Sequence, residues 1–176
     1  RRQLLDLTSR SLGLYDEFVS RVVEDSGVAI QYARTGTLEV ALDDAGVQRL
    51  ESIRKICNER GIRAELLKNQ DLFGAEPHLS ESICGGLIVE SHGFVGASDL
   101  TGALRRAAGA YGVSFETASA ATRISKNGSG IRIETIGDDF VCDAVVMAAG
   151  SWSSRVEIDG VTPVPIRPVR GQLLHL

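Results

Sequence analysis

The run from Ala144 to Gly150 ends in the residues of this sequence that are best suited to hold a ligand. It is continuously apolar, which is typical of a strand buried on both faces of a parallel sheet. Small residues at its end, Ala148-Ala149-Gly150, would let a flat ligand or another backbone approach closely. The hydroxyl residues that follow, Ser151 and Ser153, can cap a helix whose first N–H groups would bind a phosphate. A tight strand-to-helix turn with nothing bound is the alternative interpretation.

Other segments that could do chemistry carry weaker patterns. Gly128–Gly130 begins like a Gly-x-Gly-x-x-Gly loop, but Ile133 stands at the third glycine position. A polar hairpin turn is therefore the better interpretation of this segment. Ser151, Ser153 and Ser154 lack the Gly-x-Ser-x-Gly elbow of a serine hydrolase. We therefore name no catalytic residue.

The cysteines and histidines lie far apart in the sequence, without a Cys-x-x-Cys pair. They are Cys57, Cys84, Cys142, His78, His92 and His175. This spacing favours neither a metal site nor a disulfide framework, although a fold could still bring distant ligands together. We interpret the cysteines as small buried residues in a reducing compartment, which predicts a cytoplasmic location.

The composition is that of an ordinary globular domain. Of 176 residues, 43% are hydrophobic and 24% are charged, and 19 Lys and Arg against 23 Asp and Glu give a formal net charge of -4. No basic stripe is present, so we expect no nucleic-acid partner. The longest apolar run is far shorter than the roughly 20 residues that span a bilayer, so we expect no membrane span.

Hydropathy patterns predict the elements of the first half of the chain. Apolar residues recur with a helical period from Leu4 to Val23. The segment 28–42 alternates like a pair of strands around Thr35-Gly36. A second helix is predicted over 43–60, with Gly61 where a C-terminal cap belongs. The stretch 65–79 is less regular, and 84–97 has the composition of strands interrupted by glycines.

The second half predicts one more helix and a series of short strands. Ser98 or Asp99 can cap a helix that Gly112 ends. A short strand over 113–117 precedes a meander over 120–142 with a turn at Asn127-Gly128. The buried strand 143–150 follows, and the segment 163–172 is expected to lead into a last strand through Leu176. These elements predict a mixed α/β fold.

Taken together, these segments resemble the FAD-dependent amine and amino-acid oxidoreductases of the D-amino-acid oxidase group, and most of all its glycine oxidase branch. The matching segments, in chain order, are Ser11-Leu12 with Tyr15 and Phe18, Thr35–Ala41, Glu76-Pro77 with Leu79, Gly93–Val95 before Asp99-Leu100, Ala107-Ala108 before Gly112-Val113, Ala148–Ser153, and Pro168–Gln172. No one segment decides the resemblance. Their order and spacing along nearly the whole chain are specific to the group.

The resemblance implies two interleaved domains. Residues 1–27 and 98–161 would belong to a Rossmann-like FAD-binding domain. Residues 28–97 and 162–176 would belong to a substrate domain built on an antiparallel sheet. The sequence opens on Arg1 rather than Met, so we expect a piece of a longer protein whose remaining residues hold the phosphate-binding glycine loop and the substrate pocket.

The resemblance also implies which residues lie at the cofactor. The backbone of the strand near Ala121 would contact the adenine end of FAD, and the Ala149-Gly150 turn with Trp152 would lie near the cofactor. Ala121 stands where the family usually has valine, a change that a backbone contact tolerates. No catalytic acid or base is implied in this region, and no metal.

The expected reaction is the oxidation of a small amine or amino acid by hydride transfer to the flavin. One alternative is a flavin dehydrogenase that acts on D-amino acids or glycerol 3-phosphate and passes electrons to a quinone. Another is a non-enzymatic α/β binding domain without flavin. Self-association into a homo-oligomer stays open, because an apolar face left uncovered favours it.

Overall fold

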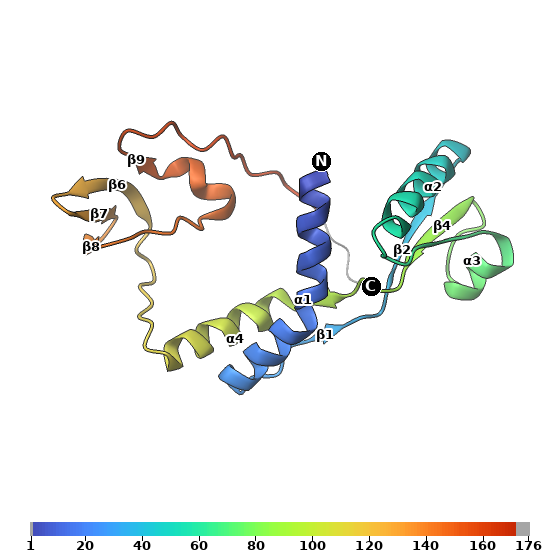
Figure 1. Ribbon diagram of the computed structural model, residues 1–176, viewed down its shortest axis with the longest axis horizontal. Coiled ribbons are helices and arrows are strands. Elements are labelled where there is room, and N and C mark those ends of the chain that lie inside the picture. The colour runs from blue at the N-terminus through green and yellow to red at the C-terminus, as the bar shows by residue number, and fades with distance from the viewer. Residues whose placement is uncertain (1, 172–176) are drawn as a thin grey trace. The chain divides into compact units, whose positions relative to one another are not determined.

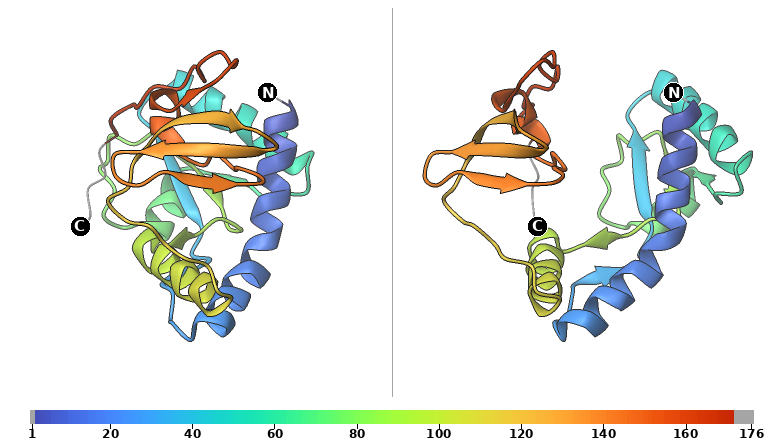
Figure 2. Two further views of the ribbon diagram at one scale, coloured as in Figure 1. Left: turned by 90° about the vertical axis from the view of Figure 1, so that its left-hand side faces the viewer. Right: turned by 60° about the vertical axis from the view of Figure 1, so that its left-hand side comes forward.

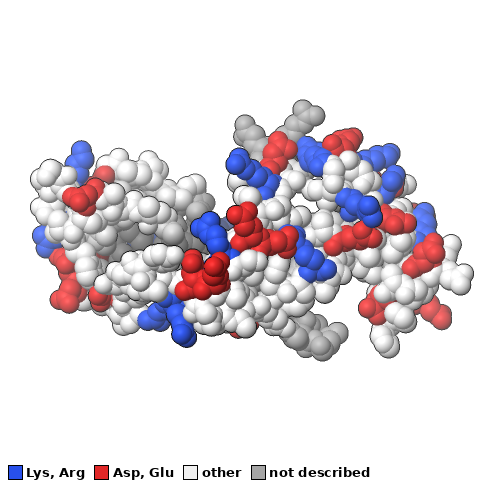
Figure 3. Space-filling view, turned by 60° about the horizontal axis from the view of Figure 1, so that its bottom comes forward, with Lys and Arg blue, Asp and Glu red and all other residues white. Residues whose placement is uncertain are grey.

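The computed structural model describes residues 2–171 of the chain, and the chain divides into two compact units, Arg1–Val113 and Ser114–Leu176 (Figure 1). None of the described helices is long and apolar enough to cross a membrane. On the face shown in Figure 3, basic and acidic side chains lie interspersed.

Two helices form one part of the first unit. Helix α1 (Arg2–Ser26) and helix α4 (Ala97–Ala110) pack against each other (Figure 1). The buried hydrophobic residues of this pair are Val19, Val22, Ala103 and Ala107. Small alanine side chains let the helix backbones approach closely. The helical expectation for both segments is confirmed.

The start of α4 differs from the expected one. Gly96 occupies the N-cap position and no side chain caps the helix, so Ser98 and Asp99 lie inside the first turn. The carboxylate of Asp99 instead accepts a hydrogen bond from the backbone N–H of Gln31 at 3.2 Å. Gly112 follows the helix with φ +85°, the left-handed conformation expected of a residue that ends a helix.

A three-stranded antiparallel sheet forms the other part of the first unit. Strands β2 (Thr37–Ala41), β4 (Gly85–Val89) and β3 (Glu65–Leu67) lie in the order β2-β4-β3. Helices α2 (Asp44–Asn58) and α3 (Asn69–Ala75) pack on it. The core of this part consists of Ala41, Leu50, Ala64, Leu87 and Val89. Leu87 and Val89 are two residues apart in β4, so they share one face of the sheet with Leu50 of α2.

A short ribbon connects the helix pair to this sheet. Strand β1 (Tyr32–Ala33) pairs antiparallel with β5 (Phe94–Val95). The strands expected around Thr35-Gly36 are present, but they do not pair with each other. Each pairs instead with the returning segment 84–97, because the chain continues in one direction through Gly36 and meets that segment on both sides of it.

The second unit is a four-stranded sheet. Strands β6 (Ala121–Asn127), β7 (Gly130–Thr135) and β8 (Phe140–Cys142) form the expected meander. Strand β9 (Glu157–Ile158) pairs parallel with β6, so the order is β8-β7-β6-β9. Gly128 takes φ +60° in the turn between β6 and β7, a conformation that glycine adopts without strain.

Two expected strands are absent from the described residues. Residues 113–117 form no strand, and neither do residues 143–149, where Val146 is 91% exposed. An apolar strand needs neighbouring strands and covering helices, and no described strand pairs with this segment. Residues 163–171 also form no strand, and the rest of the expected last strand lies outside the described residues.

Candidate functional site

Ala121 lies where a backbone contact is accessible. It is the exposed first residue of β6 and pairs with Thr135 of β7 on one side. On the other side β9 begins opposite Arg123, so no described strand lies beside Ala121 there. A bulge between Ala121 and Arg123 bends this end of β6. The geometry suits a ligand that contacts backbone rather than side chain.

The segment from Ala149 to Trp152 forms a tight turn at the start of a short 3₁₀ helix, η1 (Gly150–Arg155). Ala149 occupies its N-cap position, and no side chain caps the helix. The expected cap by the serines is therefore wrong: Ser151 lies inside η1, and the Ser153 hydroxyl donates to the carbonyl of Gly150 at 2.8 Å. The turn itself is held by the bond from the N–H of Trp152 to the carbonyl of Ala149, at 3.0 Å.

Gly150 and Trp152 leave room for a flat ligand. Gly150 takes φ +54°, and a Cβ built on it would meet no heavy atom of the described residues within 4 Å apart from those of the adjoining residues. Trp152 is 58% exposed. Small residues followed by an accessible aromatic ring fit the approach of a planar group such as a flavin or an adenine.

The sheet brings the two predicted contact regions into one unit. Strand β9 follows η1 and pairs with β6, which places Glu157 beside Arg123. The guanidinium of Arg123 donates from Nε and Nη2 to Oδ1 of Asp159, at 3.0 and 2.7 Å. This hydrogen bond raises the pKa of Arg123. The roles of Ala121, Ala149, Gly150 and Trp152 at a cofactor stay predictions.

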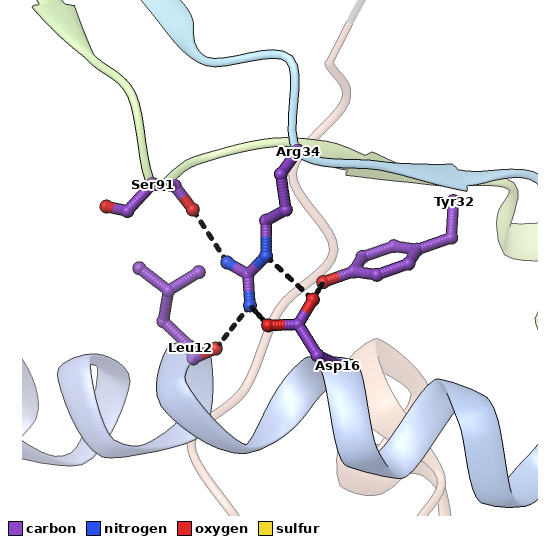
Figure 4. A network of polar contacts seen from close by, with 5 residues as sticks. All are labelled: Leu12, Asp16, Tyr32, Arg34 and Ser91. Atoms are coloured by element: carbon purple, nitrogen blue, oxygen red, sulfur yellow. Dashed lines mark hydrogen bonds and ion pairs between the residues drawn. The ribbon is translucent and has the colours of Figure 1, made fainter.

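A polar cluster that the sequence patterns did not indicate lies in the first unit (Figure 4). The Arg34 guanidinium donates to both carboxylate oxygens of Asp16, from Nε at 3.1 Å and from Nη2 at 2.9 Å. It also donates to the carbonyl of Leu12 at 2.8 Å and to the carbonyl of Ser91 at 2.6 Å. The Tyr32 hydroxyl donates to Asp16 at 2.6 Å. Three separate segments of the chain therefore meet at one guanidinium.

The cluster shifts the ionisation of its members. The hydrogen bond from Arg34, followed by the bond from Tyr32, holds the pKa of Asp16 below its ordinary value. Loss of solvent, followed by its bond to the Asp16 carboxylate, raises the pKa of Tyr32. The same carboxylate raises the pKa of Arg34. Asp16 and Arg34 therefore form a charged pair at neutral pH.

An open cleft of about 740 Å³ lies beside this cluster, bordered by α1 and by the segments that follow α2 and β4. Its charged lining residues are Asp16, Arg34, Arg60, Arg63 and Glu90. Arginines are paired with acids there: Arg63 lies 3.4 Å from Glu90, and Nε of Arg60 lies 3.5 Å from Asp6. Among residues 2–171, no group of three or more His, Cys, Asp or Glu side chains could hold a metal ion.

Comparison with known proteins decides the family. The family model described as "DAO: FAD dependent oxidoreductase" matches residues 1–176. The chain belongs to this family. The expected resemblance to the D-amino-acid oxidase group is thereby confirmed, and FAD is the cofactor of the family.

Individual relatives agree with that assignment. A glycine oxidase of Geobacillus kaustophilus is 25% identical over 170 residues, covering 96% of this chain and 45% of the relative. The hydrogen cyanide synthase subunit HcnC of Pseudomonas aeruginosa is 28% identical over 173 residues, covering 96% and 41%. A D-amino acid dehydrogenase of Bradyrhizobium diazoefficiens is 28% identical over 151 residues, covering 84% and 36%, and a glycerol 3-phosphate dehydrogenase also matches.

The fold agrees as well. A crystal structure of glycine oxidase from Geobacillus kaustophilus superposes with a TM-score of 0.81 at 26% identity, covering 86% of this chain and 41% of that one. The expected mixed α/β fold, part of the Rossmann-like architecture of FAD-dependent oxidases, is confirmed. The chain spans less than half the length of these relatives.

Proposed function

We propose that these 176 residues form the middle portion of a FAD-dependent oxidoreductase that oxidises a small amine or amino acid, in the manner of a glycine oxidase. The observation that carries the proposal is the family match along residues 1–176, together with the superposition on a glycine oxidase at a TM-score of 0.81. The proposed substrate class is that of two relatives, a glycine oxidase and a D-amino acid dehydrogenase.

Within this proposal the residues of the second unit hold the cofactor. The open backbone edge at Ala121 would contact the adenine end of FAD, and the Ala149-Gly150 turn would let the cofactor approach closely. The exposed indole of Trp152 would lie near it. When bound, FAD supplies the acceptor for a hydride. The residues of this chain would bind and orient FAD. This role agrees with the sequence analysis, which predicts no catalytic acid or base among them.

The interleaved arrangement is part of the proposal. Residues 1–27 and 98–161 would belong to the FAD-binding domain, and residues 28–97 and 162–176 to the substrate domain. The packing of α1 on α4 supports this grouping, because both helices lie in the first set. The separate core of the sheet β2-β4-β3 with α2 supports it too, because that core lies in the second set.

The test uses the product of the complete gene. We expect it to purify with a flavin absorption spectrum, and we expect glycine, D-alanine or another small amine to bleach that spectrum without oxygen. Glycerol 3-phosphate serves as the matched non-amine substrate. Bleaching by glycerol 3-phosphate alone would contradict an amine or amino-acid substrate. A protein without flavin would favour the binding-domain alternative.

A dehydrogenase remains the second candidate, because a D-amino acid dehydrogenase matches at 28% identity. Stopped-flow mixing of the substrate-reduced protein with oxygen separates the two. Fast reoxidation by oxygen supports an oxidase. Slow reoxidation by oxygen with fast reoxidation by a quinone supports the dehydrogenase. Cytoplasmic location and self-association stay predictions, the second to be measured by light scattering.

A further inference from the structure

The first unit is built so that its two parts are joined by a narrow connection. The chain leaves the helix pair through residues 27–36 and returns through residues 90–96 (Figure 2). These two passages pair as β1 and β5, with Tyr32 opposite Val95. Backbone bonds from Gly36 to His92, at 2.9 Å, and from Gly96 to Gln31, at 2.7 Å, close the ribbon at its two ends.

Apolar packing does little to set the angle between α1 and the sheet. Helix α1 packs on α4 rather than on the sheet, and the cleft of about 740 Å³ opens between α1 and the segments after α2 and β4. The Asp6–Arg60 contact across it is long, at 3.5 Å, and Nε of Arg60 has no hydrogen-bond partner. A two-stranded ribbon alone can twist and bend.

Arg34 supplies the constraint that packing does not. Its side chain is 25% exposed and donates to α1 at Asp16 and Leu12, and to the returning passage at Ser91. Its own backbone belongs to the outgoing passage, directly after β1. A planar guanidinium holds such a set of acceptors at fixed angles, whereas a lysine ammonium is a point charge on a flexible stem.

We propose that Arg34 is a positioning residue that locks the angle between the helix pair α1–α4 and the sheet β2-β4-β3. The consequence of this lock rests on the proposed function: with α1 and α4 in the FAD-binding domain and the sheet in the substrate domain, a change of this angle would slow reduction of the flavin. The bidentate bond to Asp16 and the two backbone carbonyls together form the lock. Breaking it lets the sheet move as a body relative to α1.

Spin-label distances in the complete protein test the lock directly. Labels at Ser20 of α1 and Ser52 of α2, both exposed, report the angle in a variant whose native cysteines are replaced by serine. We expect a broader distance distribution in Arg34→Ala and in Asp16→Asn than in the parent. Arg63→Ala is the matched control, because Arg63 lines the same cleft but has 80% of its side chain exposed and pairs only weakly with Glu90. An unchanged distribution in Arg34→Ala and Asp16→Asn overturns the proposal.

Flavin reduction tests the consequence. We expect the rate constant for reduction by substrate to fall about 10- to 100-fold in Arg34→Ala, because small misplacements of reacting groups have effects of that size. Flavin content should stay the same, and Arg34→Lys should restore the rate only in part. A broadened distribution with unchanged flavin reduction overturns the link to catalysis. If no amine or amino acid reduces the parent protein, the proposed function fails, while the spin-label result still decides whether Arg34 is a lock.

Discussion

Replacing Gly93 with alanine should destabilise the chain strongly, because the two passages of the ribbon touch at this residue. A Cβ at position 93 would lie 2.0 Å from the carbonyl oxygen of Ala33. It would also lie 2.9 Å from the carbonyl carbon of Ala33 and from Cα of Arg34. All three are backbone atoms, which cannot rotate out of the way as the end of a side chain can. The passages would have to separate by about 1 Å.

The magnitude follows from two terms. Overpacking of this kind costs about 1–3 kcal/mol, and each backbone hydrogen bond lost from the ribbon costs about 1 kcal/mol more. The bonds at risk are those from Gly36 to His92 and from Gly96 to Gln31. We therefore expect the free energy of unfolding to fall by about 3–5 kcal/mol in Gly93→Ala.

Urea unfolding of the 176-residue chain, followed by circular dichroism, measures this loss. Gly102→Ala is the matched control, since Gly102 lies in α4 and a Cβ there would meet nothing within 4 Å beyond the adjoining residues and the nearby backbone of its own helix. We expect the control to gain about 0.5–1 kcal/mol, because alanine favours a helix over glycine. If the free energy of unfolding of Gly93→Ala lies within about 0.5 kcal/mol of that of the unchanged chain, the close approach of the two passages is refuted.

Leu87→Ala should lower the free energy of unfolding by about 2–5 kcal/mol, since Leu87 of β4 is buried in the same core as Leu50 of α2. Leu42→Ala, at an exposed residue, should change it by less than about 0.5 kcal/mol in the same urea experiment, and equal losses would contradict the assigned core. Because Arg34 lowers the pKa of Asp16, the stability due to this pair is present above the ordinary carboxyl pKa of about 4 and is lost as pH falls through the lowered value. In Arg34→Ala the carbon-detected NMR titration of Asp16 should move upward, and an unmoved midpoint would contradict the pairing. FAD should bind the isolated 176 residues weakly or not at all in a fluorescence titration, and a submicromolar Kd would overturn that expectation.

Periodicity predicted α1, α2 and α4, because a helix is decided by neighbours three and four residues apart, but it did not indicate the short helix α3. The apolar period from Leu4 to Val23 and the cap pattern at Gly112 lie within single segments, and both α1 and α4 form. The meander β6-β7-β8 was predicted equally well, since the turn at Gly128 joins strands that are adjacent in the sequence and in the sheet. The family resemblance rested on short segments in order, which need no contact to be recognised.

The hydropathy patterns did not predict which strands pair with each other. The hydropathy of segment 28–42 alternates as in a hairpin around Thr35-Gly36. Tyr32 and Ala33 nevertheless pair with Val95 and Phe94. Which partner a strand takes depends on where the rest of the chain returns, and hydropathy does not carry that information. The apolar segment 143–149 shows the same limit, because a buried strand exists only where other strands flank it.

By itself the sequence determined the three longer helices α1, α2 and α4, the meander β6-β7-β8, the family and the cofactor of that family. The tertiary structure decided that Asp16 and Arg34, 18 residues apart and without any motif, meet beside Ser91 from a third segment. It also decided that Ala121 and the turn at Gly150 belong to one unit, through the parallel pairing of β9 with β6. The physical reason is the range of the interactions: helices and tight turns form from local contacts, whereas sites are made by side chains that only the folded backbone brings together.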